Sequence, residues 1–319
     1  MEYFNESFIL NFLPSFLFVI LLFLSSLSTS VYLENKGFLK KNLLNPLIFF
    51  FLIFGILAGI FNYLVLFDVV NYFSISLVFI ITVIISLSAL IIFKNIRLAD
   101  IFLDLKLLSK IEKYLLFLLF IYFVISLLPA SDADSLTYHL FLPHLLLENK
   151  QFPVDNNLII FRVFSSNETL LLISNILKSD NFGSILNFFV LYTISIYFLK
   201  KKNHLTTLFI LASPLMIFFI STQKLQIFFA LIYLTVIILV YEKKYLNLIN
   251  LFFISFLLVF YISGKINYII FGAPLFCLIV FKLKKLHLIK KFIFYCIISF
   301  LIIYFPILLK KAILFGDPF

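Results

Sequence analysis

The chain has 319 residues, of which 64% are hydrophobic and only 13% are charged. A water-soluble domain is about 45–50% apolar and about 25% charged, so this composition excludes a soluble globular protein and indicates an integral membrane protein. Long apolar runs between short polar segments favour helices as the spanning elements, because the strands of a membrane β-barrel alternate in polarity over about 10 residues. The net charge of +10 falls between the apolar runs and not along one face, so nucleic-acid binding is not expected.

The apolar runs predict an all-α, multi-pass fold with about ten transmembrane helices, because about 20 apolar residues cross a bilayer. The first run is expected to be a retained helix and not a signal peptide, since Glu2 and Glu6 precede it and no Lys or Arg does. The predicted helices are 8–32, 46–67, 72–93, 112–129, 182–199, 205–221, 225–241, 246–262, 266–281 and 292–309.

The distribution of Lys and Arg predicts the orientation of these helices. One set of loops, together with Lys113, collects 18 of the 25 basic residues. Cytoplasmic loops carry this excess, so both termini are expected to face outward. The predicted cytoplasmic loops are 33–45, 94–111, 200–204, 242–245 and 282–291.

One long outer connection, residues 130–181, is expected to carry the function. It holds six of the ten acidic residues assigned to the outer side. Two segments in it, 138–150 and 167–178, are apolar but too short to span, and they predict interfacial helices that pack onto the bundle. Ser165 and Glu168 match a capping box at the start of the second segment, which favours a helix-start role for Glu168 over a catalytic one. His144 and Glu148 receive no role from the sequence.

An acidic motif opens this connection. Asp132 and Asp134 lie two residues apart just beyond a predicted transmembrane helix, where carboxylates meet both water and lipid headgroups. Tyr138 and His139 follow one helical turn later, on the same face by their spacing, which favours a functional site. The alternative is that Asp134 or Ser135 caps the next helix and that Asp132 is merely solvated.

The motif and the segments around it resemble a known family. The sequences LPASDADSLTYHLFLPHLLLENKQF and FSSNETLLLISNILKSDNFGSILNF are similar to the bacterial membrane glycosyltransferases of the GT-C superfamily, relatives of the dolichyl-phosphate-mannose protein mannosyltransferases. The resemblance covers residues 112–319 and leaves helices within 1–111 without an assigned role. It implies a catalytic Asp in the first long outer loop and a location in the bacterial cytoplasmic membrane. Similar members continue beyond a segment like Gly316-Asp317-Pro318, so the resemblance also implies that the chain is a fragment or a short member.

The chemistry of such enzymes needs a base and a positive charge. An acceptor hydroxyl attacks the anomeric carbon of a sugar on a polyprenyl phosphate; a carboxylate takes the hydroxyl proton, and cations or a metal stabilise the departing phosphate. We expect Asp134 to be the base and Asp132 to bind a divalent metal ion or the acceptor. Lys224, Lys265 and Arg162 are the candidate cations, although lysines at helix ends also snorkel to headgroups.

The sequence therefore predicts a transferase that moves a sugar from a polyprenyl-phosphate donor to a glycan, lipid or protein acceptor outside the cytoplasm. Tyr138 and His139 are expected to bind substrate beside the base. A non-enzymatic transporter or flippase of lipid-linked glycans is the main alternative, but it predicts charged residues within the helices, and the predicted spans hold almost none. A polysaccharide polymerase or ligase is a third possibility, which favours Arg and His over paired Asp.

Overall fold

A computed structural model of the chain describes residues 8–93, 108–152, 164–241, 248–283 and 285–318. The regular elements within these ranges are all helical. The α-helices are α1 (Phe8–Asn35), α2 (Asn45–Leu66), α3 (Tyr72–Phe93), α4 (Lys110–Ser126), α5 (Phe141–Asn149), α6 (Ser166–Leu170), α7 (Leu172–Leu177), α8 (Phe182–Lys200), α9 (His204–Leu211), α10 (Pro214–Ile220), α11 (Gln226–Tyr241), α12 (Leu248–Ser263), α13 (Ile269–Leu283), α14 (Leu286–Ile303) and α15 (Phe305–Phe315).

The helices have the length and apolarity of a membrane protein. Five of the described helices are long and apolar enough to cross a bilayer, and the bent pair α14–α15 adds a sixth if it counts as one span. The outer surface of α3 suits lipid, because only 11% of its most apolar window is buried, whereas 89% of that of α8 is buried. The chain is therefore a helical membrane protein. The five candidate spans are Asn11–Asn35, Asn45–Leu66, Tyr72–Phe93, Phe182–Lys200 and Ile266–Leu283.

The prediction of one continuous helix over 205–221 is wrong. Helix α9 ends at Leu211 and α10 begins at Pro214. Proline has no N–H to donate and disfavours the helical conformation in the residue before it, and Ser213 is accordingly extended, with ψ 123°. A proline therefore divides this predicted span.

The predicted helix 292–309 is also broken, into α14 and α15, which meet at 54°. Pro306 cannot donate a backbone hydrogen bond to Ile302, one turn earlier. Asn62 on α2 supplies a side-chain donor at the same break, where its Nδ2 donates to the carbonyl oxygen of Ile303 at 2.6 Å. The bend therefore leaves this carbonyl paired, as a buried backbone group requires.

Each of the two predicted interfacial segments contains two short helical elements instead of one helix. Residues 138–150 contain the end of a π-helical turn, Ser135–His139, and α5, while 167–178 contain α6 and α7. The capping box at the start of α6 is confirmed. The Ser165 hydroxyl accepts from the backbone N–H of Asn167 at 3.3 Å, and the Glu168 carboxylate accepts from the backbone N–H of Ser165 at 2.8 Å. This outcome supports the structural reading of Glu168.

The chain forms two compact units, each made of three segments that are separate in the sequence. These units do not test the functional division at residues 111 and 112, which stays a prediction. Helices α2, α3 and α11 each contribute to both units. Unit 1 comprises Met1–Phe50, Val78–Leu140 and Ile173–Leu231, and unit 2 comprises Phe51–Leu77, Phe141–Leu172 and Ile232–Phe319.

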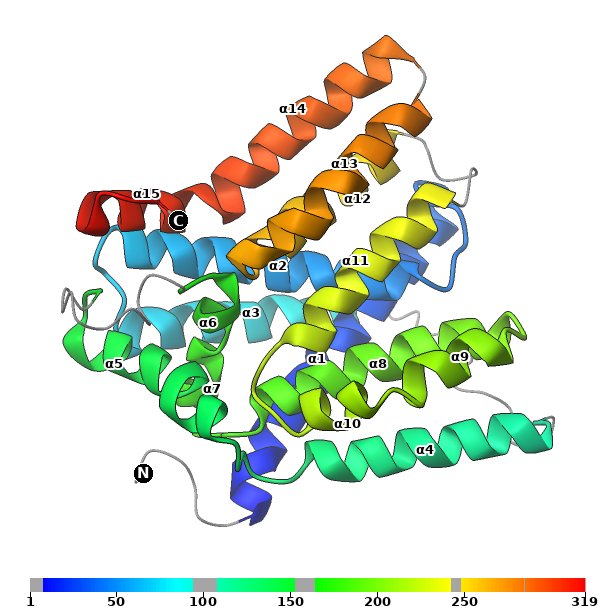
Figure 1. Ribbon diagram of the computed structural model, residues 1–319, viewed down its shortest axis with the longest axis horizontal. Helices are drawn as coiled ribbons and strands as arrows, with labels where there is room; N and C mark the ends of the chain where they lie inside the picture. Colours follow the sequence, from blue (N-terminus) through cyan, green and yellow to red (C-terminus); the bar gives the residue numbers. More distant parts are fainter. Residues whose placement is uncertain (1–7, 94–107, 153–163, 242–247, 284, 319) are drawn as a thin grey trace. The chain divides into compact units, whose positions relative to one another are not determined.

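Unit 1 is built around α8, most of whose side chains are buried. Helices α4, α9 and α10 lie beside α8 and α1 packs against it, as Figure 1 shows. In lipid such helices are held by close packing and by hydrogen bonds between them. One such bond runs from the Tyr122 hydroxyl on α4 to the carbonyl oxygen of Leu211 on α9.

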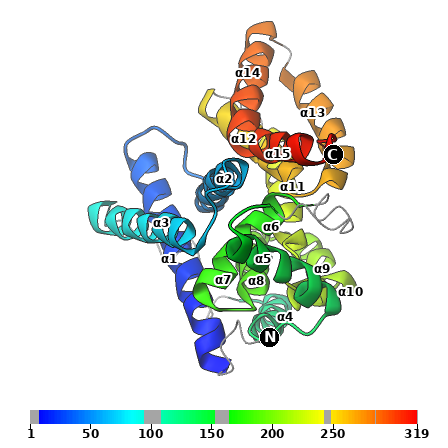
Figure 2. The same cartoon turned by 90° about the vertical axis from the view of Figure 1, so that its left-hand side faces the viewer.

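Unit 2 is built around the pairing of α12 with α14. Helix α13 packs against both, and Figure 2 shows these three helices grouped together. The chain enters α13 through a 3-10 turn at Ile266–Tyr268, and α6 contacts α12. Helix α15 ends at Gly316, whose left-handed φ of 69° favours glycine at that position.

Candidate functional site

An ion pair joins two of the residues predicted to act together. The Nζ of Lys224, in the turn between α10 and α11, lies 2.7 Å from Oδ2 of Asp134, in the loop after α4. The Lys224 side chain is only 13% exposed whereas that of Asp134 is 69% exposed. The Lys224 ammonium also lies 5.2 Å from the centre of the Phe218 ring, within cation–π range. A mostly buried cation therefore presents its charge to an exposed carboxylate.

Asp132 has a different environment from Asp134. Its Oδ2 accepts from the backbone N–H of Ser135 at 2.9 Å, so Asp132 caps the π-helical turn. Asp134 precedes this turn but makes no side-chain cap, and the Ser135 hydroxyl accepts from the backbone N–H of Gln223, so Asp132 is not merely solvated. The second oxygen of Asp132, Oδ1, is buried and has no hydrogen-bond partner in the described part of the chain. The motif thus contains one capping carboxylate and one carboxylate paired with a lysine.

A hydrogen bond ties the acidic motif to the turn that carries Lys224. The backbone N–H of Gln223 donates to the Ser135 hydroxyl at 2.8 Å. The Gln223 side chain faces the other way and accepts from the backbone N–H of Gly183 at 2.6 Å through its Oε1. Because a Cβ atom on Gly183 would lie 2.7 Å from the Gln223 carbonyl oxygen, only glycine allows this approach. These contacts hold the turn against the start of α8.

Asn187 on α8 fixes the same turn from the membrane side. Its Nδ2 donates to the carbonyl oxygens of Phe219 at 3.2 Å and Lys224 at 2.8 Å. Its Oδ1 accepts from the backbone N–H of Phe228 at 3.0 Å, in the first turn of α11. One amide therefore satisfies backbone groups at both ends of the turn. Asn187 was not predicted from the sequence, although an amide side chain within an apolar helix is a signal of such a role.

Asp180 anchors the other end of the motif. Its Oδ2 accepts from the backbone N–H of Ala130 at 3.2 Å, its Oδ1 accepts from the Asn11 side chain on α1, and its N–H donates to Asn11 Oδ1 at 2.8 Å. Burial raises the pKa of the Asp180 carboxyl above its ordinary value. The neighbouring Asn181 and Ser184 side chains bind the carbonyl oxygens of Leu127 and Ser126. The loop that carries the acids is thus fixed before Asp132 and again at Ser135.

Exchange of two side chains tests this anchor. We expect Asp180→Asn to loosen the loop, because an amide cannot accept from both Ala130 and Asn11. The double variant Asn11→Asp with Asp180→Asn restores complementary donors and acceptors and should restore the wild-type behaviour. The readout is thiol labelling of a cysteine at the buried Ala130, in a background without Cys277 and Cys296.

Labelling of the purified protein by a maleimide should be roughly tenfold faster in Asp180→Asn than in the parent, since a hydrogen bond to a charged group contributes about 1.5–3 kcal/mol. It should return to the parent rate in the exchanged pair. Equal rates in all three proteins would show that Asp180 does not anchor the loop.

Three of the four remaining predicted site residues, Tyr138, His139 and Lys265, lie among the described residues. Tyr138 is half-buried, and its ring packs edge-on against the ring of His139. The His139 side chain is buried, whereas that of Asp134 is exposed. Lys265 belongs to unit 2, where it precedes the 3-10 turn at Ile266. Arg162 lies outside the described residues. Their roles stay predictions.

A metal ion at the acidic motif also stays a prediction. Within the part of the chain that the structure describes, no three His, Cys, Asp or Glu side chains are grouped closely enough to hold one. Lys224 faces Asp134 and brings a positive charge to this motif.

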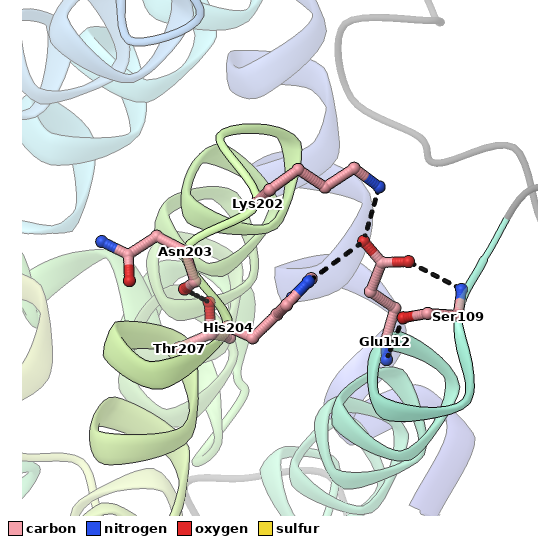
Figure 3. Close-up of polar contacts among 6 residues, drawn as sticks. All are labelled: Ser109, Glu112, Lys202, Asn203, His204 and Thr207. Atoms are coloured by element: carbon pink, nitrogen blue, oxygen red, sulfur yellow. Dashed lines mark hydrogen bonds and ion pairs between the residues drawn. The ribbon is translucent and has the colours of Figure 1, made fainter.

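A second polar cluster lies at the other end of α4 (Figure 3). Glu112, whose side chain is 1% exposed, accepts from Lys202 Nζ at 2.8 Å through Oε1 and from the Ser109 backbone N–H at 2.8 Å through Oε2. His204 Nε2 lies 3.9 Å from the same Oε1. Lys202, at φ 56°, closes α8 in the left-handed region, and Asn203 caps α9. These contacts join α4 to the α8–α9 turn, which indicates a structural role.

The Glu112 cluster predicts a loss of stability in acid. The hydrogen bond from Lys202 and the backbone N–H of Ser109 hold the pKa of Glu112 at about 2, below its ordinary 4.5. Glu112 lies in the polar first turn of α4, before the apolar stretch that starts at Leu115. A lowered pKa stabilises the fold above the ordinary pKa, and this contribution is lost as the pH falls from about 4.5 to about 2.

We therefore expect the melting temperature of purified Glu112→Gln to depend less on pH between about 5 and about 2 than that of the wild type. Lys202→Gln should behave similarly, because it removes the largest cause of the shift. Lys201→Gln is the matched control, since the Lys201 ammonium lies over the Tyr197 ring at 4.6 Å. Parallel pH profiles for the wild type and Glu112→Gln would contradict the assignment.

Comparisons of the chain with protein-family models, with curated proteins and with solved structures found no match. The geometry and chemistry of the site are therefore the basis for a functional proposal.

Proposed function

We propose that this protein is a membrane glycosyltransferase that moves a sugar from a polyprenyl-phosphate donor to an acceptor hydroxyl on the outer face of the bacterial cytoplasmic membrane. The observation that carries the proposal is the 2.7 Å ion pair between Lys224 and Asp134. It brings together, from segments 90 residues apart, the two charges that this reaction needs. One is a cation for the departing phosphate and the other is a carboxylate for the acceptor proton.

The ion pair also suggests an order of events. Lys224 and Asp134 neutralise each other before the donor binds, so Asp134 is a weak base in that state. The donor phosphate competes for Lys224 and releases Asp134. Because the Asp134 carboxylate is 69% exposed, water screens this pair, and a phosphate monoanion or dianion can open it at small cost. The base then becomes available when the donor is in place.

The chemical step uses both residues. The acceptor hydroxyl gives its proton to Asp134 as its oxygen bonds to the anomeric carbon. The bond between this carbon and the phosphate oxygen breaks, and the phosphate leaves with the electron pair while Lys224 holds its negative charge. Asp132 positions the motif through its cap on Ser135. Tyr138, His139, Lys265 and Arg162 are proposed to contact the substrates.

The proposal includes the ten predicted crossings and the outward orientation of both termini. Helices α4, α11 and α12 have 17, 16 and 16 residues, which corresponds to about 24–26 Å at 1.5 Å per residue. They cross the hydrocarbon core of about 30 Å only with local thinning of the bilayer or with contributions from their flanking residues. The two proline-broken helices count as one crossing each.

A deletion strain tests the function. Mass spectrometry of envelope glycans and lipid-linked sugars should show that one sugar is absent from the acceptor and that its polyprenyl-phosphate form accumulates outside. Accumulation of intact lipid-linked precursor in the cytoplasmic leaflet would instead favour a transporter or flippase. Loss of polymer length with unchanged sugar composition would favour a polymerase or ligase.

A further inference from the structure

Three side chains in unit 2 form a hydroxyl–imidazole–carboxylate series that the proposed reaction does not use. The Tyr72 hydroxyl, at the start of α3, lies 3.3 Å from Nδ1 of His144 on α5. The other ring nitrogen of His144, Nε2, lies 3.0 Å from Oε1 of Glu148, one turn further along α5. His144 therefore lies between a proton donor and a carboxylate.

The burial of the three groups differs in a way that suits a reactive site. The His144 side chain is only 5% exposed, whereas that of Glu148 is 49% exposed and Tyr72 is 44% exposed. The imidazole is thus buried beside a partly exposed tyrosine. A nucleophile beside a base, with a further charged group next to that base, resembles the general arrangement of activated hydroxyl groups.

We propose that Tyr72, His144 and Glu148 form a second acid–base site, whose ligand is a neutral hydroxyl compound such as a sugar. The bound hydroxyl passes its proton to the Tyr72 oxygen, and the Tyr72 proton moves to Nδ1 of His144. The resulting imidazolium is stabilised by the Glu148 carboxylate beside Nε2. The series contains a carboxylate and no cation, so it favours a neutral ligand over a phosphate. The site needs no lipid-linked donor and goes beyond the proposed transfer.

The reactivity of Tyr72 tests the site without any assay of transfer. An aryl sulfonyl fluoride forms an ester when a tyrosine oxygen bonds to its sulfur, the S–F bond breaks, fluoride leaves and the base takes the proton. Peptide mass spectrometry of the purified full chain in nanodiscs would measure the rate at Tyr72. Tyr114, which is 72% exposed on α4, is the internal control.

We expect Tyr72 to be modified faster than Tyr114 although it is less exposed. Glu148→Gln alters a surface side chain and should slow Tyr72 at least tenfold, and His144→Gln should slow it at least as much, since a positioned base typically contributes roughly 10²–10⁴-fold. The rate at Tyr114 should not change in either variant, and an unchanged melting temperature would report that the variants are folded. Unchanged Tyr72 rates in folded Glu148→Gln and His144→Gln would overturn the proposal.

Protection experiments test the ligand class. Glucose, galactose, mannose and xylose at high concentration would be added in turn during the reaction, with permethylated glucose as the matched control. At least one free sugar should slow the modification of Tyr72 and leave Tyr114 unchanged. Absence of protection by all four, or equal protection by the permethylated sugar, would overturn the assignment to a hydroxyl ligand.

Discussion

Asp134→Asn should abolish sugar transfer while the protein is produced and inserted normally. Asparagine keeps the size of the side chain and can still accept a hydrogen bond from Lys224, but it cannot take the acceptor proton. A general base typically contributes roughly 10²–10⁴-fold to the rate, so transfer from a polyprenyl-phosphate sugar should fall by at least about 100-fold in an assay with purified protein.

Asp132→Asn is the matched comparison for Asp134→Asn. An asparagine at this position still caps the π-helical turn through its side-chain oxygen, so a larger loss is expected from Asp134→Asn than from Asp132→Asn. Wild-type transfer by Asp134→Asn would reject Asp134 as the base. Activity in both variants would reject the enzymatic reading of the motif.

Asn187→Leu should cause a large loss of stability. The Asn187 amide pairs with the carbonyl oxygens of Phe219 and Lys224 and with the backbone N–H of Phe228. Each buried polar group left without a partner costs about 1–3 kcal/mol, and some of these groups can turn to other partners. A loss of roughly 2–5 kcal/mol in the free energy of unfolding is therefore expected, measured by denaturant titration in detergent.

Thr193→Val is the control for Asn187→Leu on the same helix. The Thr193 hydroxyl donates only within α8, to the carbonyl oxygen of Phe189 at 2.8 Å, so its loss should cost less than about 1 kcal/mol. If Asn187→Leu and Thr193→Val were equally stable, the amide would not hold the turn that carries Lys224.

The sequence predicts the existence of most helices but not the places where they break. Long apolar runs such as those of α2, α3 and α8 match their helices closely, because each run alone supplies the length that a bilayer requires. Pro214 and Pro306 also lie within apolar runs. A hydropathy pattern gives no information about the backbone N–H that proline lacks, so it does not show that the helix breaks there. Pro306 is itself a local signal for the break, but the support from Asn62, a residue over 240 positions away, is not visible in the local sequence.

The charged residues of the candidate site were predictable from the sequence, but the residues that hold them in place were not. Asp134 and Lys224 were both predicted as site residues, and the structure brings them together. Asn187 and Asp180 contribute through hydrogen bonds to distant backbone groups, and such partners depend on the folded arrangement. His144 and Glu148 have no assignable partner in the sequence because Tyr72 reaches them from a different helix.

The most direct test of the proposed function is the affinity of the protein for a polyprenyl-phosphate sugar, measured for the wild type, Asp134→Asn and Lys224→Gln. The ion pair predicts opposite effects. Asp134→Asn removes the negative charge opposite Lys224 and should tighten donor binding by about 1.4- to fivefold, which corresponds to about 0.2–1 kcal/mol for a pair whose carboxylate is exposed. Lys224→Gln removes the cation and should weaken binding by more than tenfold, since hydrogen bonds to charged groups contribute about 1.5–3 kcal/mol. Equal affinities in all three proteins would contradict the proposed function of the ion pair.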